Sequence, residues 1–182
     1  LHLPLQSGSD RVLHRMRRWY TIETYYQKVA MLRELLPDVS LSTDIIVGFP
    51  GETDKEFEMT IEAIRKIRFD LIYSFKYSPR PGTRAADYPG HLSESVKSER
   101  LKILLETQEK IVREKFQAFV GTEHEVLIEG NHHRKADTVT GRTRGNHPVS
   151  MKNSTKQAGE LISVVITKAN QNSLEAVPSS EI

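Results

Sequence analysis

Three short segments rich in glycine, proline and hydroxyl groups carry the residues of this sequence that could do chemistry. Each follows an apolar run, and they are Gln6-Ser-Gly-Ser9, Gly48-Phe-Pro-Gly51 and Tyr77-Ser-Pro-Arg-Pro-Gly-Thr83. Glycine lets the backbone come close to a ligand, and proline stiffens a loop so that less entropy is lost on binding. A single glycine after a strand is about three times in four only a turn. The three segments together favour a cofactor site.

One acidic residue adds to this expectation. Asp44 lies inside an otherwise apolar run, where a carboxylate is costly unless a partner satisfies it. A cationic or hydroxyl group of a ligand would satisfy it, and a structural arginine or a backbone group would do so nearly as well. Both interpretations of Asp44 stay open at this point.

Composition limits the chemistry that the chain can do alone. The 182 residues include 26 basic and 24 acidic side chains, and 37% are hydrophobic, which is enough to bury a core. Cysteine is absent, and this excludes disulfides, thiolate nucleophiles and cysteine-bound metal in this chain. There is no long apolar run and no signal-like amino terminus, so we expect no membrane partner and a cytoplasmic location.

The elements that must position these segments follow a βα pattern up to about residue 92. We expect strands at 1–5, 41–47 and 71–77, and helices that begin after the caps Ser9, Thr21 and Thr53. The middle strand is so apolar from Ile45 onward that we expect helices on both of its faces. The carboxyl ends of parallel strands meet at one edge of a sheet, so the three segments should share one rim.

We expect a long amphipathic helix at 93–119, which either joins two domains or lies on the surface. After this helix the spacing of the apolar residues changes. Beyond it, five short runs with period two predict a small closed or partly closed OB-like barrel. These runs are 126–128, 138–140, 148–149, 161–167 and 174–177. The sequence therefore predicts an α/β domain at 1–119 and an all-β domain at 120–182.

Two basic clusters indicate contact with nucleic acid. The first consists of Arg15, Arg17, Arg18, Trp19 and Tyr20. These side chains could neutralise phosphates and stack on bases, and a solvated helix end explains them equally well.

The second cluster lies in residues 131–156, where Asp137 is the only acidic residue. Its basic residues are Arg134, Lys135, Arg142, Arg144, Lys152 and Lys156. On a small barrel such a stripe predicts contact with an RNA backbone. The adjacent pair His132 and His133 lacks the spacing of metal ligands, so we expect no metal site.

Four passages of the chain resemble the radical-SAM methylthiotransferases, most closely their tRNA branch. They are 2–10, 44–53, 73–83, and 126–130 together with 141–146. The resemblance implies the later half of a partial (βα) radical-SAM barrel, followed by a TRAM domain, which is an OB-like barrel that binds RNA. It also implies S-adenosylmethionine and [4Fe-4S] clusters as cofactors. The cysteines that hold the clusters would lie outside this chain, in a missing amino-terminal part of the same enzyme.

The resemblance further implies roles for individual residues. The residues expected near S-adenosylmethionine are Gln6, Ser7, Asp44, Ile46, Val47, Gly48, Tyr77 and Ser78, the last two near the adenine. The family reaction replaces a C–H bond of an adenosine next to the tRNA anticodon, already isopentenylated, with a methylthio group. Gln-Ser-Gly-Ser at 6–9 favours this substrate over threonylcarbamoyl-adenosine in tRNA or a ribosomal protein. Arg17 stands where the family pattern leads us to expect a small or amide residue.

Two functions remain as alternatives. The chain is either a catalytic fragment of a tRNA methylthiotransferase, inactive alone, or a non-enzymatic RNA-binding protein. A cysteine motif encoded upstream in the same frame would favour the enzyme. A parallel sheet that begins at residues 1–5 would expose an unpaired edge, so we also expect the isolated chain to form oligomers or to be partly unfolded.

Overall fold

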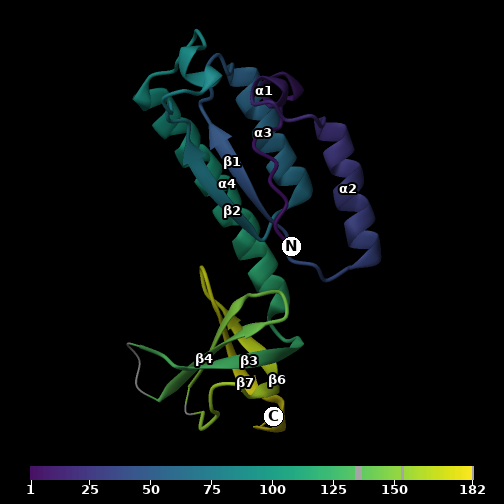
Figure 1. The fold of residues 1–182 in the computed structure, drawn as a ribbon. Helices are drawn as coiled ribbons and strands as arrows, with labels where there is room; N and C mark the ends of the chain where they lie inside the picture. Colours follow the sequence, from purple (N-terminus) through teal and green to yellow (C-terminus); the bar gives the residue numbers. More distant parts are fainter. Residues whose placement is uncertain (134–136, 153, 182) are drawn as a thin grey trace. The chain divides into compact units, whose positions relative to one another are not determined.

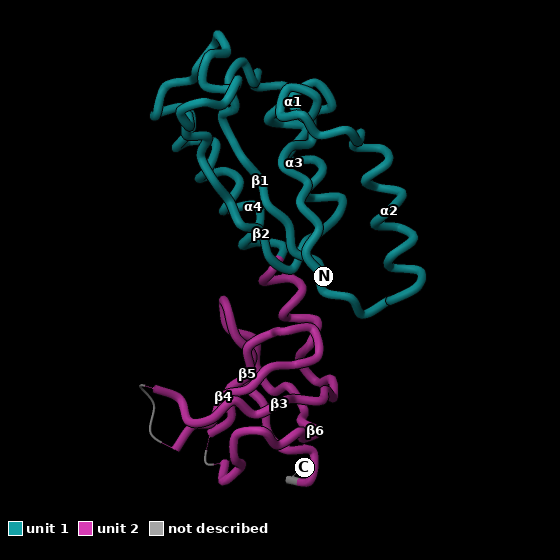
Figure 2. The backbone as a smooth tube through the Cα atoms, viewed as in Figure 1, with its two compact units in different colours: residues 1–111 teal, residues 112–182 magenta. Residues whose placement is uncertain are grey.

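The computed structural model describes residues 1–133, 137–152 and 154–181 (Figure 1). The chain forms two compact units, residues 1–111 and 112–182 (Figure 2). The elements in chain order are α1 (Asp10–Arg15), α2 (Ile22–Leu35), β1 (Ser42–Val47), α3 (Asp54–Ile67), β2 (Leu71–Lys76), the 3-10 helix η1 (Arg84–Asp87), α4 (Glu94–Phe119), β3 (Glu123–Asn131), β4 (Thr138–Thr143), β5 (Pro148–Lys152), β6 (Leu161–Ala169), β7 (Leu174–Pro178) and the 3-10 helix η2 (Ser179–Glu181). Among the described residues, no helix combines the length and apolar character needed to cross a membrane.

The first three helices begin at the caps that the sequence predicts. Ser9 accepts a hydrogen bond from the Val12 amide at the start of α1, and Thr21 caps α2. Thr53, the predicted cap of α3, forms a reciprocal capping box with Glu56. These helix starts are confirmed because a capping side chain and its amide partner are only three residues apart.

The expected strand at 1–5 is wrong as a regular strand. The segment runs parallel to β1 and meets it only in isolated bridges, from His2 to Ser42 and from Gln6 to Ile45. Pro4 has no amide hydrogen to donate, and the Leu5 amide donates to Thr43 Oγ1 at 2.8 Å instead of to a backbone carbonyl.

The edge along this segment is also less open than the sequence predicts. The Tyr25 hydroxyl donates to the Leu3 carbonyl at 2.7 Å, and the Tyr20 hydroxyl lies 3.0 Å from the carbonyl oxygens of Pro4 and Leu5. The Leu5 side chain is fully buried. Tyrosine side chains therefore occupy backbone acceptors that a bare edge would leave free.

Helices cover one face of the sheet, so the expectation that they cover both is wrong. β1 pairs with β2 in parallel, from Ser42 opposite Leu71 to Val47 opposite Lys76. Burial alternates along β1, and its buried side chains pack in one core with residues of α2, α3 and α4. On the other face Tyr73 and Phe75 remain about half exposed, at 49% and 51%. The apolar run that begins at Ile45 hides this alternation in the sequence.

The second unit is a closed barrel with the strand order β3-β4-β5-β7-β6 in the described part of the chain, as predicted. Neighbouring strands are antiparallel except for β5 and β7, which are parallel. Its core contains Val126, Ile128, Val139 and Met151. Gly141 permits close packing, because a Cβ atom there would lie 2.4 Å from the Leu127 carbonyl oxygen.

Candidate functional site

A cavity of about 810 Å³ lies in the first unit, among the loops at the carboxyl ends of β1 and β2. Five of the residues predicted to contact S-adenosylmethionine line it, and they are Gln6, Asp44, Ile46, Tyr77 and Ser78. Ligands of parallel βα folds bind at this edge of the sheet. The structure thus brings together residues that are far apart in the sequence.

The other three predicted residues do not line the cavity. Ser7 is fully buried, and its Oγ accepts a hydrogen bond from the Ser9 amide at 3.2 Å. Val47 belongs to the apolar core. Gly48 has a φ of +74°, and its amide donates to Glu52 Oε2 at 2.8 Å, so this amide is already occupied within the protein. A Cβ atom at Gly48 would lie 2.5 Å from Lys97 Cγ.

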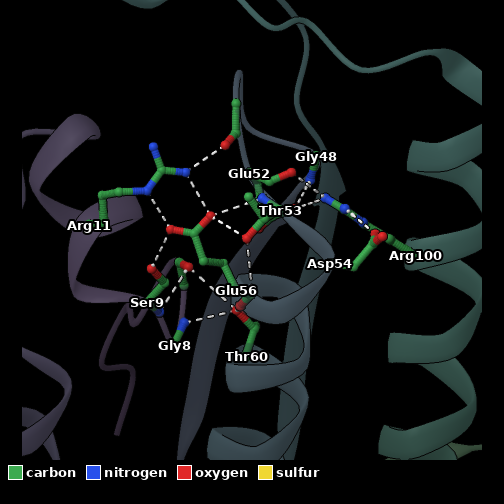
Figure 3. A network of polar contacts seen from close by, with 12 residues as sticks. Gly8, Ser9, Arg11, Gly48, Glu52, Thr53, Asp54, Glu56, Thr60 and Arg100 are labelled. Carbon is green, nitrogen blue, oxygen red and sulfur yellow. Dashed lines mark hydrogen bonds and ion pairs between the residues drawn. The ribbon is translucent and has the colours of Figure 1, made fainter.

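The Glu56 carboxylate links the first rim segment, through Ser9, to the start of α3, through Thr53 (Figure 3). Arg11 Nε lies 2.6 Å from Glu56 Oε1, which also accepts from Ser9 Oγ at 3.1 Å. The other carboxylate oxygen accepts from the Thr53 amide and hydroxyl, each at 2.8 Å. The hydrogen bond from Arg11 is the main cause that lowers the pKa of Glu56 to about 2. The sequence indicates Glu56 only as a helix cap, and nothing in it pairs Arg11 with this residue.

A buried ion pair ties the second rim segment to α4. Arg100 Nη1 lies 2.6 Å from Glu52 Oε2, and both side chains are almost fully buried. Arg100 also donates to the Glu52 carbonyl at 3.2 Å and to Asp54 at 2.7 Å (Figure 3). Burial raises the pKa of Glu52, and the Gly48 amide and the Arg100 charge oppose it. The pair holds the Gly48–Glu52 turn, and sequence reasoning missed both residues.

The partner of Asp44 is a histidine. His2 Nε2 lies 3.4 Å from Asp44 Oδ2, and the other ring nitrogen of His2 lies 3.0 Å from Ser42 Oγ. The Asp44 side chain is 29% exposed and lines the cavity. Among the described residues, the partner is neither the arginine nor the backbone group that the sequence left open. The carboxylate still faces a space where a ligand can reach it.

Two buried polar atoms of cavity-lining residues have no hydrogen-bond partner among the described residues. They are Tyr77 Oη and Arg15 Nε. The Tyr77 ring packs edge-on against Phe49, with centroids 5.1 Å apart, and burial is the main cause that raises the Tyr77 pKa. The Arg15 guanidinium lies over the Tyr88 ring at 4.5 Å. Buried polar groups without a partner are uncommon in folded proteins and mark places where a ligand can bind.

The predicted RNA-binding residues of the second unit are partly neutralised by acidic residues of β3. Arg142 pairs with Glu129 at 3.1 Å, and Arg144 pairs with Glu125 at 2.6 Å. Lys152 is exposed and forms no ion pair with a described residue. The prediction also named Arg134 and Lys135, which lie outside the described residues. Exposed ion pairs of this kind contribute little stability, about 0–1 kcal/mol, so phosphate can replace the acidic partner at low cost.

Comparison with known proteins covers most of the chain. Residues 1–64 match the model of the Radical SAM superfamily, and residues 117–178 match that of the TRAM domain. The chain is 46% identical to a tRNA-2-methylthio-N(6)-dimethylallyladenosine synthase of Thermodesulfovibrio yellowstonii, over 96% of this chain and 40% of that protein. It is 46% identical to the protein of the same name from Moorella thermoacetica, over 93% of this chain and 38% of that protein.

The synthase of the same name from Aquifex aeolicus is 43% identical, over 96% of this chain and 39% of that protein. The chain therefore spans about 40% of the length of the curated relatives that it matches. The Radical SAM match contains the first two rim segments, 6–9 and 48–51, and the TRAM match coincides with the closed barrel. By these matches the chain belongs to the radical-SAM methylthiotransferase family, of which it carries a Radical SAM part and a TRAM domain.

Proposed function

We propose that this chain is part of a tRNA methylthiotransferase that acts on N6-isopentenyladenosine next to the anticodon. The chain would supply the rim segments around the cavity and an RNA-binding domain. The observation that carries the proposal is the cavity, in which segments from three parts of the sequence meet at the end of a parallel sheet. The names of the similar proteins support the substrate, since each is called a tRNA-2-methylthio-N(6)-dimethylallyladenosine synthase.

The residues of the cavity fit S-adenosylmethionine. Asp44 offers a carboxylate to the ammonium or hydroxyl groups of that molecule, and Tyr77 Oη is a buried polar group without a partner in the described residues. Gln6 and Ser78 supply further polar groups, and Ile46 supplies an apolar surface. When bound, S-adenosylmethionine supplies the radical chemistry that opens the C–H bond of the substrate.

The proposed role of this chain is to bind and orient S-adenosylmethionine. The Glu52–Arg100 pair fixes the turn that follows β1, and Glu56 fixes that turn against the segment before α1. Buried aromatic side chains such as Phe49 keep water from the cavity wall. The chain contains no cysteine, so thiolate ligands of a [4Fe-4S] cluster must come from a missing part of the enzyme. That part and tRNA are the proposed partners.

A chimera tests this function. Residues 1–182 would replace the matching segment of the Thermodesulfovibrio yellowstonii synthase, to which they are 46% identical. We expect the reconstituted chimera to convert isopentenyladenosine in tRNA to its methylthio derivative, as measured by mass spectrometry of the nucleosides. A folded chimera with an intact cluster that leaves isopentenyladenosine unchanged, yet modifies threonylcarbamoyl-adenosine or a ribosomal protein, would refute the proposed substrate.

The same chimera tests the role of Asp44. We expect Asp44→Ala to weaken binding of S-adenosylmethionine at least tenfold, because a charge-assisted hydrogen bond contributes about 1.5–3 kcal/mol. Asp38→Ala removes an exposed carboxylate outside the cavity and serves as the matched control. Unchanged affinity in the Asp44 variant, measured by equilibrium dialysis, would remove this residue from the site.

A non-enzymatic RNA-binding protein is the second candidate, and the absence of cysteine is the observation that favours it. The two candidates differ in what precedes the chain. An upstream coding sequence in the same frame that contains a CxxxCxxC motif supports the enzyme. A mature polypeptide that begins at Leu1 and binds tRNA supports the alternative.

A further inference from the structure

Four exposed arginines line the cavity. Arg17 and Arg18 follow α1, whereas Arg80 and Arg84 come from the loop after β2. None of the four forms a hydrogen bond or an ion pair through its side chain with a described residue, although Arg11, Arg100, Arg142 and Arg144 all pair with carboxylates. Asp44 is the only acidic residue among the described residues that line the cavity, and His2 already pairs with it.

The backbone at Arg17 is held in an unfavourable conformation. Its φ is +58°, in the left-handed region that favours glycine or asparagine. The Arg17 amide donates to the His14 carbonyl and the Arg18 amide to the Leu13 carbonyl, both at 2.9 Å. This pattern ends α1 with a Schellman motif, and it explains why a small or amide residue is expected here. This turn places Arg17 among the residues that line the cavity.

Aromatic side chains accompany the arginines. Trp19 is 82% exposed and follows Arg18 directly, and Phe75 in the cavity is about half exposed. The cavity also contains the two buried atoms without partners among the described residues, Tyr77 Oη and Arg15 Nε. Unpaired cations beside exposed rings are typical of surfaces that bind single-stranded nucleic acid.

We infer that this arginine-rich rim, defined by Arg17, Arg18, Arg80 and Arg84, binds phosphate groups of single-stranded RNA, with a base stacked on Trp19. The inference rests on the proposed function and adds a second RNA contact, separate from the basic residues of the barrel. S-adenosylmethionine does not explain the rim, because one carboxylate, one ammonium and one sulfonium leave that molecule with a net positive charge. A phosphodiester backbone supplies several negative charges at the spacing of neighbouring nucleotides.

The single tryptophan of the chain makes the rim measurable. The full chain is titrated with a fluorescein-labelled, single-stranded oligoribonucleotide. Trp19 emission reports on the rim, and anisotropy of the label reports on all binding. We expect RNA to quench Trp19. Each arginine that is lost from the rim should lower the slope of log affinity against log salt by about 0.7.

Arg17→Gly is the sharpest variant, because it removes a charge and also relieves the backbone. We expect its melting temperature to be unchanged or higher while RNA affinity and the salt slope fall. Arg80→Gln combined with Arg84→Gln should lower the slope by about 1.4. Arg65→Gln, at an exposed pair with Glu58, is the control that leaves both readouts unchanged.

The outcomes separate this inference from the proposed function. Quenching and affinity that stay the same in the rim variants, while Arg142→Gln with Arg144→Gln weakens binding, would overturn the rim and leave RNA binding by the barrel intact. Displacement of the RNA by polyglutamate at equal charge concentration would also overturn it, since the rim would then be a general polyanion site. No salt-dependent RNA binding by the unsubstituted chain would overturn the rim and the RNA-binding part of the proposed function together.

Discussion

Glu56 shows how one side chain can organise the cavity rim. Its carboxylate accepts hydrogen bonds from Ser9, Arg11 and Thr53. Ser9 and Arg11 precede β1 in the sequence, and Thr53 follows it. Each bond to an ionised carboxylate favours the charged form over the protonated form. The hydrogen bond from Arg11 is the largest cause that lowers the Glu56 pKa to about 2, against an ordinary value of 4.5, and the hydrogen bonds from Thr53 and Ser9 lower it further.

The pH dependence of stability tests this arrangement. The folded-state pKa of Glu56 lies below the unfolded value, so its contribution is complete above pH 4.5 and is lost as the pH falls through about 2. We expect the free energy of unfolding in urea to fall between pH 5 and pH 2 by on the order of 3 kcal/mol more in the unsubstituted chain than in Glu56→Gln. Parallel pH curves would contradict this. Glu58→Gln, at an exposed ion pair, is the control, with a change below about 1 kcal/mol.

At the scale of elements, the rim depends on α4 as much as on the strands. α4 supplies Arg100, which pairs with Glu52 in the turn after β1. It also supplies Lys97, whose side chain packs against Gly48. The same helix places Leu104 and Ile111 in the core that supports β1. The position of the Gly48–Glu52 turn is therefore set by a helix that begins more than forty residues later in the chain.

Removal of the Arg100 charge tests this dependence. Arg100→Ala leaves the Glu52 carboxylate buried without its counterion, and breaking a buried pair in this way costs about 3–5 kcal/mol. We expect that loss in the free energy of unfolding from urea titration. Arg100→Met combined with Glu52→Gln should recover much of it, because the glutamine can still accept from the Gly48 amide. Lys102→Ala, exposed on α4, is the matched control, and an equal loss there would contradict the argument.

At the scale of the whole molecule, two cores share one helix. Ile111 packs in the core of the first unit, and Phe116 packs in the core of the barrel. The division at residues 111 and 112 follows from this packing, whereas the sequence predicts a boundary at 119 and 120, where the helical pattern ends. The two boundaries assign the last turns of α4 to different units.

Two shortened chains distinguish these boundaries. Residues 112–182 retain Phe116, which is 6% exposed, and residues 120–182 lack it. Loss of a buried phenylalanine costs about 3–5 kcal/mol. We therefore expect the longer piece to melt cooperatively and the shorter one to melt at a clearly lower temperature or to be unfolded, as measured by circular dichroism. Equal melting temperatures would place the boundary at the end of α4.

The sequence by itself determined the features that depend on residues close together in the chain. The caps at Ser9, Thr21 and Thr53 act over three residues, and the period of two after residue 122 marks the barrel strands. The rim segments and the family resemblance also came from local motifs. These features can be predicted from the sequence because their physical cause lies within a few residues.

Only the tertiary structure decided which distant groups meet. It paired Arg11 with Glu56 and Arg100 with Glu52, and it gave Asp44 a histidine partner. It left Tyr73 and Phe75 of β2 about half exposed on the second face of the sheet and brought Arg17 and Arg84 to the same cavity. These contacts join residues forty or more positions apart, with no local pattern to mark them. They were decided by how the helices pack on the sheet, because packing alone sets which side chains face one another.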